Sequence, residues 1–353
     1  MADWPLNLNT VEDVALVALG LLVLTVVAGW LVTSQVLKQL RRQAILDHPN
    51  ERSSHEQPTP RGGGWGILLV LFPCWTSILS FGGLPFETFW LLGAAALLAW
   101  VSWLDDLRTI GARYRFGVQI IAVFMGLFAL TPFGPITQGW LPFWLDRLLI
   151  GVAWLWFMNL YNFMDGIDGL AGSETAAIGL GLTLVVLISP TLGLGWSDGA
   201  LLGVTMAGAS LGFLLWNWSP AKLFMGDVGS IPLGFLIGWL LFALAAQGYL
   251  FAAIILPLYF CVDASVTLVR RVISGAKPWE PHREHFYQRA TQRGLSHGAT
   301  VTTISATNIG LIACAVLAVF YQAWALIPAG IVMVLALWFL TRDHGVSGPP
   351  TGL

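Results

Sequence analysis

Hydrophobic residues make up 56% of this 353-residue chain, and charged residues only 10%. Soluble globular proteins carry about 25% charged residues, so the composition excludes a soluble globular domain and favours a protein surrounded by membrane lipid. The net charge of −2 identifies no partner, and we expect no nucleic-acid binding. The cysteines lie in apolar runs without Cys-x-x-Cys spacing, which argues against a disulfide framework or a zinc site.

A membrane-spanning helix needs about 20 mainly apolar residues, and eleven stretches of the chain approach this requirement. We expect the first to be retained, because it is too long for the core of a signal peptide. The last two form one apolar stretch, which we divide at Tyr321-Gln322. The sequence predicts an all-α fold, a single polytopic transmembrane bundle over 1–353, with spans at 11–37, 64–83, 86–104, 116–131, 147–163, 169–189, 199–216, 229–247, 249–269, 301–320 and 322–340.

Lysine and arginine residues gather on one side of the predicted bundle. Every basic residue except Arg147 lies in loops 38–63, 105–115, 217–228 or 270–300, or in the C-terminal tail. Because basic loops stay in the cytoplasm, we place these loops there. The N-terminus is then outside and the C-terminus inside, in a bacterial inner membrane.

Two adjacent carboxylates, Asp105 and Asp106, end the predicted span 86–104 on the cytoplasmic side. Carboxylates at the C-terminal end of a helix oppose its dipole. At the end of an apolar helix they are costly unless they are solvated, paired or metal-bound. This pattern favours a functional pair, and a solvated helix terminus is the alternative.

A second polar group follows the span 147–163. Asn159, Asn162 and Asp165 are three residues apart and share one helix face, and Asp168-Gly makes a further turn. Such spacing in an apolar region is difficult to explain by packing. The cluster faces the cytoplasm rather than the middle of the bilayer, which suits chemistry between a soluble substrate and a lipid.

Asp227 lies between Gly226 and Gly229 at the entrance of the span 229–247, so its carboxylate is sterically open. Mg²⁺ prefers one or two carboxylates together with substrate phosphate oxygens. We predict Asp227 as a Mg²⁺ ligand, with Asn162 as a second oxygen ligand. An N-cap role before this helix is the alternative, although Ser230 could serve equally.

Two further cytoplasmic segments offer groups for phosphate. Gly62-Gly63-Gly64 precedes a span, so its backbone N–H groups could approach a phosphate. His282, Arg283 and His285 offer side-chain donors for diphosphate oxygens. A flexible basic loop is the alternative in both cases, and no third ligand near the histidines supports a zinc site.

The segments NFMDGIDGLAG at 162–172 and PAKLFMGDVGS at 220–230 resemble the polyprenyl-phosphate N-acetylhexosamine-1-phosphate transferase family, glycosyltransferase family 4. The similarity covers about residues 40–300, with catalytic loops at about 38–63, 105–115, 162–172, 217–230 and 270–300. The segments PNERSSH and HREHFYQR are most similar to the branch that starts O-antigen synthesis.

The resemblance implies a Mg²⁺-dependent phosphotransferase. Such an enzyme moves an N-acetylhexosamine-1-phosphate from a UDP-sugar to undecaprenyl phosphate and releases UMP. Its partners are these two substrates and membrane lipid, and a homodimer is compatible with this function. It implies that Asp227 binds magnesium and that Asp105 and Asp106 handle the lipid phosphate. It also implies donor-binding roles for a further set of residues, namely Asn162, Asp165, Asp168, Asn217 and Phe224, with Phe224 and Asp168 at the uracil. We add Asn159 to the substrate-binding residues because it shares the helix face of Asn162.

The resemblance is least direct in the loop 270–300. The family's pentapeptide transferase carries three consecutive histidines where this chain has Arg283-Glu284-His285, and it has a lysine in the first loop that is missing between 39 and 63 here. These departures argue against a peptide-bearing muramoyl substrate. By physical reasoning we assign Arg283 and His285 to charge stabilisation and His282 to substrate binding.

The rival interpretation is a transporter or flippase of lipid-linked sugar. A transporter favours charged residues near the middle of the membrane and two related halves. The sequence shows one deep carboxylate, Asp263, and no internal repeat. Asp263 could be a functional residue or a structural partner of a neighbouring helix.

Overall fold

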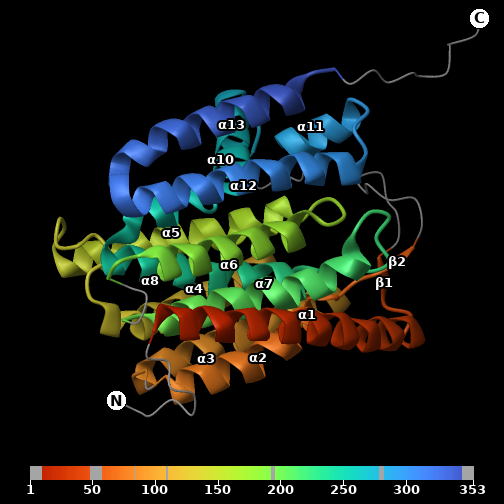
Figure 1. The fold of residues 1–353 in the computed structure, drawn as a ribbon. Coiled ribbons are helices and arrows are strands. Elements are labelled where there is room, and N and C mark those ends of the chain that lie inside the picture. The colour runs from red at the N-terminus through yellow and green to blue at the C-terminus, as the bar shows by residue number, and fades with distance from the viewer. Residues whose placement is uncertain are drawn as a thin grey trace, which may run out of the picture.

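The computed structural model describes residues 10–47, 58–82, 84–108, 110–191, 195–277 and 282–343. The segment 48–55, which carries most of one family-like motif, lies outside them. Long helices run side by side as a bundle (Figure 1). The helices are α1 (Val11–Arg42), α2 (Gly64–Phe81), α3 (Trp90–Leu107), α4 (Ala112–Ala129), α5 (Phe143–Met164), α6 (Leu170–Ile188), α7 (Ser197–Asn217), α8 (Asp227–Leu244), α9 (Leu250–Ile255), α10 (Leu258–Ile273), α11 (Phe286–Gln292), α12 (His297–Tyr321) and α13 (Leu326–Thr341).

The described part of the chain contains nine helical stretches long and apolar enough to cross a membrane. This confirms a polytopic helical membrane protein. One of the nine, His297–Thr341, holds both α12 and α13, which pack against each other. The chain reverses between them at Gln322, whose φ is 46°, so two helices form where the sequence predicted a division.

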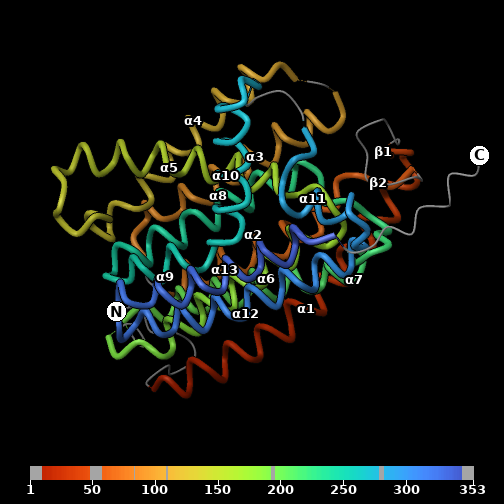
Figure 2. Tube along the Cα trace, turned by 90° about the horizontal axis from the view of Figure 1, so that it is seen from above, coloured from red at the N-terminus to blue at the C-terminus, as the bar shows by residue number. Residues whose placement is uncertain are grey.

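The predicted span 249–269 is not one helix. It is built from α9 and α10, which meet at Leu256-Pro257. Proline has no backbone N–H and crowds the preceding turn, so it interrupts an α-helix. Before α9 the chain bends at Gly248, whose φ is 99°. Figures 1 and 2 show α10 running across the direction of the long helices.

Small residues allow the closest helix contacts in the bundle. A Cβ added at Gly29 of α1 would lie 2.6 Å from the carbonyl oxygen of Ala209 in α7. A Cβ at Gly212 of α7 would lie 2.3 Å from the carbonyl oxygen of Val26. In lipid, helices associate through such close backbone packing rather than through the hydrophobic effect. Helices α1 and α7 therefore pack with their backbones in close contact.

Helix α8 is buried along most of its length and packs against α3 and α5. Its first residue is Asp227, while Asp105 and Asp106 lie near the end of α3 and Asn162 lies near the end of α5. The direction of these three helices brings two C-terminal ends to one N-terminal end. The helix packing thus gathers the predicted polar residues at one end of the bundle.

Candidate active site

The loop before α2 is hydrogen-bonded to the loop before α8. Phe224 donates its N–H to the carbonyl of Pro60 at 2.8 Å, in the short strand β2 (Thr59–Pro60), which pairs with β1 (Leu46–Asp47). The N–H groups of Gly62 and Gly63 donate to the carbonyl of Phe224, and that of Gly64 donates to Met225. These three N–H groups therefore donate to carbonyl groups of the protein. The prediction that they bind a phosphate is wrong.

Asp106 holds the beginning of α8. Its side chain is fully buried. It accepts hydrogen bonds from the backbone N–H groups of Val228 at 3.0 Å and Asp227 at 3.3 Å. An ionised carboxylate at a helix N-terminus satisfies otherwise unpaired donors and favours the helix dipole. Gly226 makes room for it, since a Cβ there would lie 2.8 Å from Oδ2 of Asp106.

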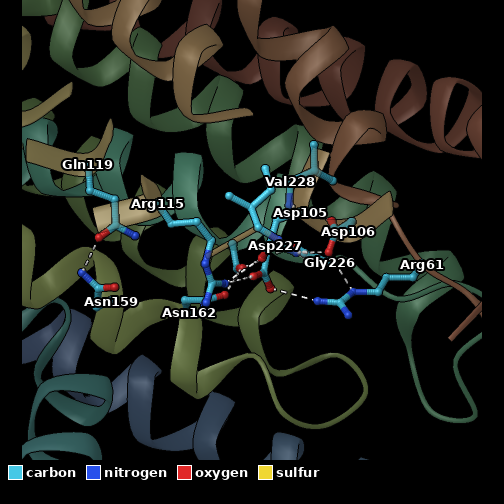
Figure 3. A network of polar contacts seen from close by, with 12 residues as sticks. Arg61, Asp105, Asp106, Arg115, Gln119, Asn159, Asn162, Gly226, Asp227 and Val228 are labelled. Atoms are coloured by element: carbon cyan, nitrogen blue, oxygen red, sulfur yellow. Dashed lines mark hydrogen bonds and ion pairs between the residues drawn. The ribbon is translucent and has the colours of Figure 1, made fainter. Parts of the chain in front are cut away.

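Two arginines neutralise this cluster (Figure 3). Arg61 places Nε 2.9 Å from Asp106 and Nη2 3.0 Å from Asp227. Arg115 places Nη1 2.7 Å from Asp105 and 3.5 Å from Asp227. Three carboxylates from α3 and α8 therefore share two guanidinium groups, and each arginine side chain remains about one-third exposed.

The guanidinium of Arg115 has an unpaired edge. Only its Nη1 is paired, and its buried Nε has no acceptor among the described residues. The N–H groups of Nε and Nη2 point along one edge of a guanidinium, in the geometry that binds two phosphate oxygens. A buried donor without a partner is costly, so this edge favours an anionic ligand. Arg61 differs, because its Nε and Nη2 are both used by carboxylates.

The two asparagines of α5 have different neighbours. Asn162 accepts a 2.5 Å hydrogen bond from the hydroxyl of Ser230 in the first turn of α8. Asn159 donates to Gln119 of α4 at 2.9 Å, one turn deeper in the bundle (Figure 3). Asn162 is thus fixed beside the start of α8, whereas Asn159 connects α5 to α4.

Asp165 follows α5 and is a fourth carboxyl group near the cluster. Burial and the negative charge of Asp227 raise its pKa to about 7, although Arg61 partly opposes the shift. Near neutral pH this group can therefore hold a proton.

Asp168 and Asn217 join the turn after α5 to the loop before α8. Asp168 accepts the N–H of Ala221 at 3.1 Å and lies 3.4 Å from Nδ1 of His297. Burial raises the pKa of Asp168, but these hydrogen bonds and the charge of His297 outweigh it, so the pKa is lowered. Asn217 accepts the N–H of Gly169 at 3.0 Å and donates to the carbonyl of Leu223. Both side chains therefore fix the loop that carries Phe224.

The segment before α11 forms a separate cluster around α10. His285 is buried, with Nδ1 3.1 Å from Oδ1 of Asp263. Burial, with the nearby His285 and Arg271, lowers the pKa of His282 to about 4, so its ring is neutral at pH 7. The carbonyl of Arg283 accepts a hydrogen bond from Gln292 at 3.0 Å. The ring of His285 thus contacts Asp263 and the rings of His282 and Tyr287, in a cluster separate from that of Asp227.

The donor chemistry at Asp227 suits magnesium. Within the described ranges, no three His, Cys, Asp or Glu side chains are grouped as metal ligands. Mg²⁺ does not need three, because it is commonly held by one or two carboxylates with phosphate oxygens and water. Asp227 offers two carboxylate oxygens, and Asn162 an amide oxygen, at the same end of α8. Since Arg61 and Arg115 are partly exposed, they can yield these oxygens to a cation.

The interpretation of the sequence missed several residues of this site. Arg61 and Arg115 were counted only as basic loop residues, Ser230 was considered only as an N-cap, and His297 and Gln119 were not considered. The arginines carried a usable signal, since Arg115 lies ten residues after Asp105 in the same loop and Arg61 adjoins the glycine run. Nothing in the sequence pairs His297 with Asp168, because the two come together only in the folded chain.

A model of "Glycosyl transferase family 4" matches residues 88–245. The chain is 30% identical over 336 residues to the decaprenyl-phosphate N-acetylglucosaminephosphotransferase of Mycolicibacterium smegmatis, covering 83% of this chain and 79% of the relative. It is 29% identical over 293 residues to a probable undecaprenyl-phosphate N-acetylglucosaminyl 1-phosphate transferase of Bacillus subtilis, covering 78% and 77%. It is 31% identical over 259 residues to the phospho-N-acetylmuramoyl-pentapeptide-transferase of Chlamydia pneumoniae, covering 64% and 72%.

Proposed function

This chain belongs to glycosyl transferase family 4, and we propose from this that it transfers an N-acetylhexosamine-1-phosphate from a UDP-sugar to undecaprenyl phosphate, releasing UMP. The observation that carries the proposal is the unpaired guanidinium edge of Arg115 beside Asp105 and Asp227, at one end of a membrane-spanning bundle. Such a site can meet a soluble diphosphate and a lipid phosphate together. We place this end on the cytoplasmic side of the bacterial inner membrane, because the basic loops gather there.

The reaction forms one phosphorus–oxygen bond and breaks another. An oxygen of the lipid phosphate attacks the phosphorus next to the sugar, and the bond from that phosphorus to UMP breaks, so UMP leaves as an anion. Catalysis of phosphoryl transfer is mainly positioning and charge neutralisation. Mg²⁺ bound at Asp227 and Asn162 would supply positive charge to the diphosphate. No strong base is required, because a phosphate nucleophile is already ionised at neutral pH.

The residues of the chain divide these tasks. Arg115 binds phosphate oxygens through its unpaired edge while its Nη1 stays on Asp105. Asp106 keeps the start of α8 in place, and with it the carboxylate of Asp227. Asp165 holds or releases a proton near neutral pH. Arg283 lies in the loop 270–300, the fifth of the predicted catalytic loops and called the fifth loop below, and we assign it to the diphosphate charge.

The donor nucleotide is assigned to the loop that Asp168 and Asn217 support. Asn217 bonds Gly169 and Leu223, so it acts through the loop, while Phe224 offers a ring for stacking with uracil. Two of the relatives named above act on N-acetylglucosamine by name, and we propose the same sugar. The product is a lipid-linked precursor of a cell-envelope polysaccharide, with O-antigen as the specific candidate.

Release of UMP tests this function. Protein purified in detergent should release UMP from UDP-N-acetylglucosamine only when undecaprenyl phosphate and Mg²⁺ are both present. Chelation should stop the release, and added Mg²⁺ should restore it. UMP formed without the lipid would indicate a hydrolase, and no UMP with any UDP-N-acetylhexosamine would contradict the proposal. A transporter finds no support, because every relative named above is a transferase.

A further inference from the structure

Asp263 is a fully buried carboxylate in α10, outside the cluster around Asp227. Its Oδ1 accepts the backbone N–H of Phe286 at 3.0 Å. Its Oδ2 accepts the backbone N–H of Tyr287 at 3.2 Å and the hydroxyl of Tyr259 at 3.0 Å. A buried charge is tolerated only when such donors surround it. Asp263 therefore accepts hydrogen bonds from Tyr259 and from two backbone donors at the beginning of α11.

The same carboxylate determines which nitrogen of His285 carries a proton. Nδ1 of His285 lies 3.1 Å from Oδ1 of Asp263. An ionised carboxylate can only accept, so with Asp263 ionised Nδ1 donates the hydrogen bond and Nε2 is the ring acceptor. The ring is also held between the rings of His282 and Tyr287, with centroids 4.9 and 5.6 Å away. Asp263 thus fixes both the tautomer and the orientation of His285.

Helix α10 also binds the fifth loop through a second residue, Arg271. Arg271, two turns beyond Asp263, is buried and forms an ion pair with Glu284 and a 3.3 Å hydrogen bond to the carbonyl of Lys277. The fifth loop in turn touches the end of α5, since Tyr287 donates its hydroxyl to the carbonyl of Phe163 at 3.2 Å. Because Phe163 lies two residues before Asp165, a chain of contacts runs from α10 to the end of α5 next to Asp165.

We propose that Asp263 is a positioning residue of the transfer reaction. It acts through His285 and the backbone of Phe286 and Tyr287, and it holds the fifth loop against the turn that carries Asp165. The inference rests on the proposed function for its catalytic part. Its structural part, the anchoring of residues 285–287 by one carboxylate, can be measured without any substrate.

The first experiment measures hydrogen exchange in Asp263→Asn. Asparagine keeps the shape but loses the charge and one acceptor oxygen, so the amide protons of Phe286 and Tyr287 should exchange at least about tenfold faster than in the wild type. Glu174→Gln is the matched control. Glu174 is equally buried in α6 and bonds Asn308 of α12, so it should leave exchange at 285–287 unchanged. Unaltered exchange in Asp263→Asn would overturn the anchoring.

The second experiment is a double-mutant cycle on kcat with Asp263→Asn and His285→Gln, each measured per folded enzyme. Asp263→Asn alone should lower kcat about tenfold, and in the His285→Gln background it should lower kcat less than about threefold. Glu174→Gln should retain wild-type kcat. A full tenfold effect in both backgrounds, or wild-type kcat in Asp263→Asn, would overturn the action through His285. A wild-type protein that transfers no sugar phosphate would contradict the proposed function alone, because the exchange experiment would still decide the anchoring.

Discussion

The two ends of the bundle hold their carboxylates in different ways. Asp146, at the beginning of α5, is fully buried and accepts the N–H groups of Thr137 at 2.7 Å and Ile136 at 3.3 Å, nine and ten residues away in sequence. Asp227, at the other end, pairs with Arg61, which lies 166 residues away. Since α5 is about 33 Å long, the two sites are separated by most of a membrane.

This difference teaches how to tell a structural carboxylate from one that serves a ligand. Asp146 is satisfied by backbone donors of its own loop, which cannot leave without unfolding that loop, and the guanidinium of the adjacent, largely buried Arg147 lies 3.7 Å away. Asp227 is neutralised by guanidinium groups on partly exposed side chains from distant loops, which can move. A carboxylate of the second kind keeps its oxygens available at little structural cost. The predictions below test whether Asp146 is structural and Asp227 serves a ligand.

The largest expected effect is on turnover in Asp227→Asn. The amide has one oxygen and no charge, so it is a poor Mg²⁺ ligand, and we expect kcat to fall at least about a thousandfold with the fold retained. The matched variant Asp146→Asn should show the opposite behaviour. Asparagine has one acceptor oxygen, so one buried backbone N–H loses its acceptor, which costs about 1–3 kcal/mol of stability. The melting temperature should therefore fall while kcat stays near wild type.

Rates of UMP release and melting curves of both variants check this pair. Wild-type-like turnover in Asp227→Asn would remove it as the metal ligand. A large loss of turnover in a folded Asp146→Asn protein would show that the two ends of the bundle are coupled, against the contrast drawn here.

The helices and the carboxylates were accessible from the sequence for a physical reason. Apolar runs of membrane length leave few alternatives to helices, and Asp105, Asp106 and Asp227 stand out because they are charged at the ends of such runs. The break at Pro257 was missed because the surrounding composition stays apolar. The role of Arg115 was missed because the sequence does not distinguish an arginine that makes a loop basic from one that binds phosphate. Only the folded structure shows that one edge of the Arg115 guanidinium has no partner within the described part of the chain.

Arg115→Lys tests that unpaired edge. Lysine keeps the charge but loses the two parallel donors, so we expect kcat/KM to fall about thirtyfold, close to 2 kcal/mol of transition-state stabilisation. Arg113 is an exposed arginine of the same helix, and Arg113→Lys should retain wild-type kcat/KM. Equal losses in both variants would mean that the loop acts only through its net charge.

A smaller effect is expected in the fifth loop. Arg283→Lys should lower kcat about tenfold, about 1.4 kcal/mol of barrier, because the guanidinium fork is lost. Arg289→Lys should be nearly silent, since Arg289 lies 3.8 Å from Glu284 in a partly exposed ion pair that lysine can also form. Steady-state kinetics of the two variants decide the point, and matching kinetics would remove Arg283 from the site.

The smallest expected effect is on stability, and it comes from Asp165. Its pKa is about 7 in the folded protein and 3.8 in a model compound. The folded state therefore binds this proton more tightly than the unfolded state does, so the stabilisation is complete below about pH 4 and is lost as the pH rises through 7. The melting temperature in detergent should fall between pH 5.5 and pH 7.5, and Asp165→Asn should flatten that part of the profile. An unchanged profile in the variant would show that other groups titrate there.

The measurement that tests the central claim most directly follows the phosphorus next to the sugar. Purified protein is given UDP-N-acetylglucosamine labelled with radioactive phosphorus in its β-phosphate, together with undecaprenyl phosphate and Mg²⁺. Transfer of sugar-1-phosphate predicts that the label moves into the extracted lipid while unlabelled UMP accumulates in equal amount. Label that stays in released UDP would mean that the sugar is transferred without its phosphate, and it would contradict the account.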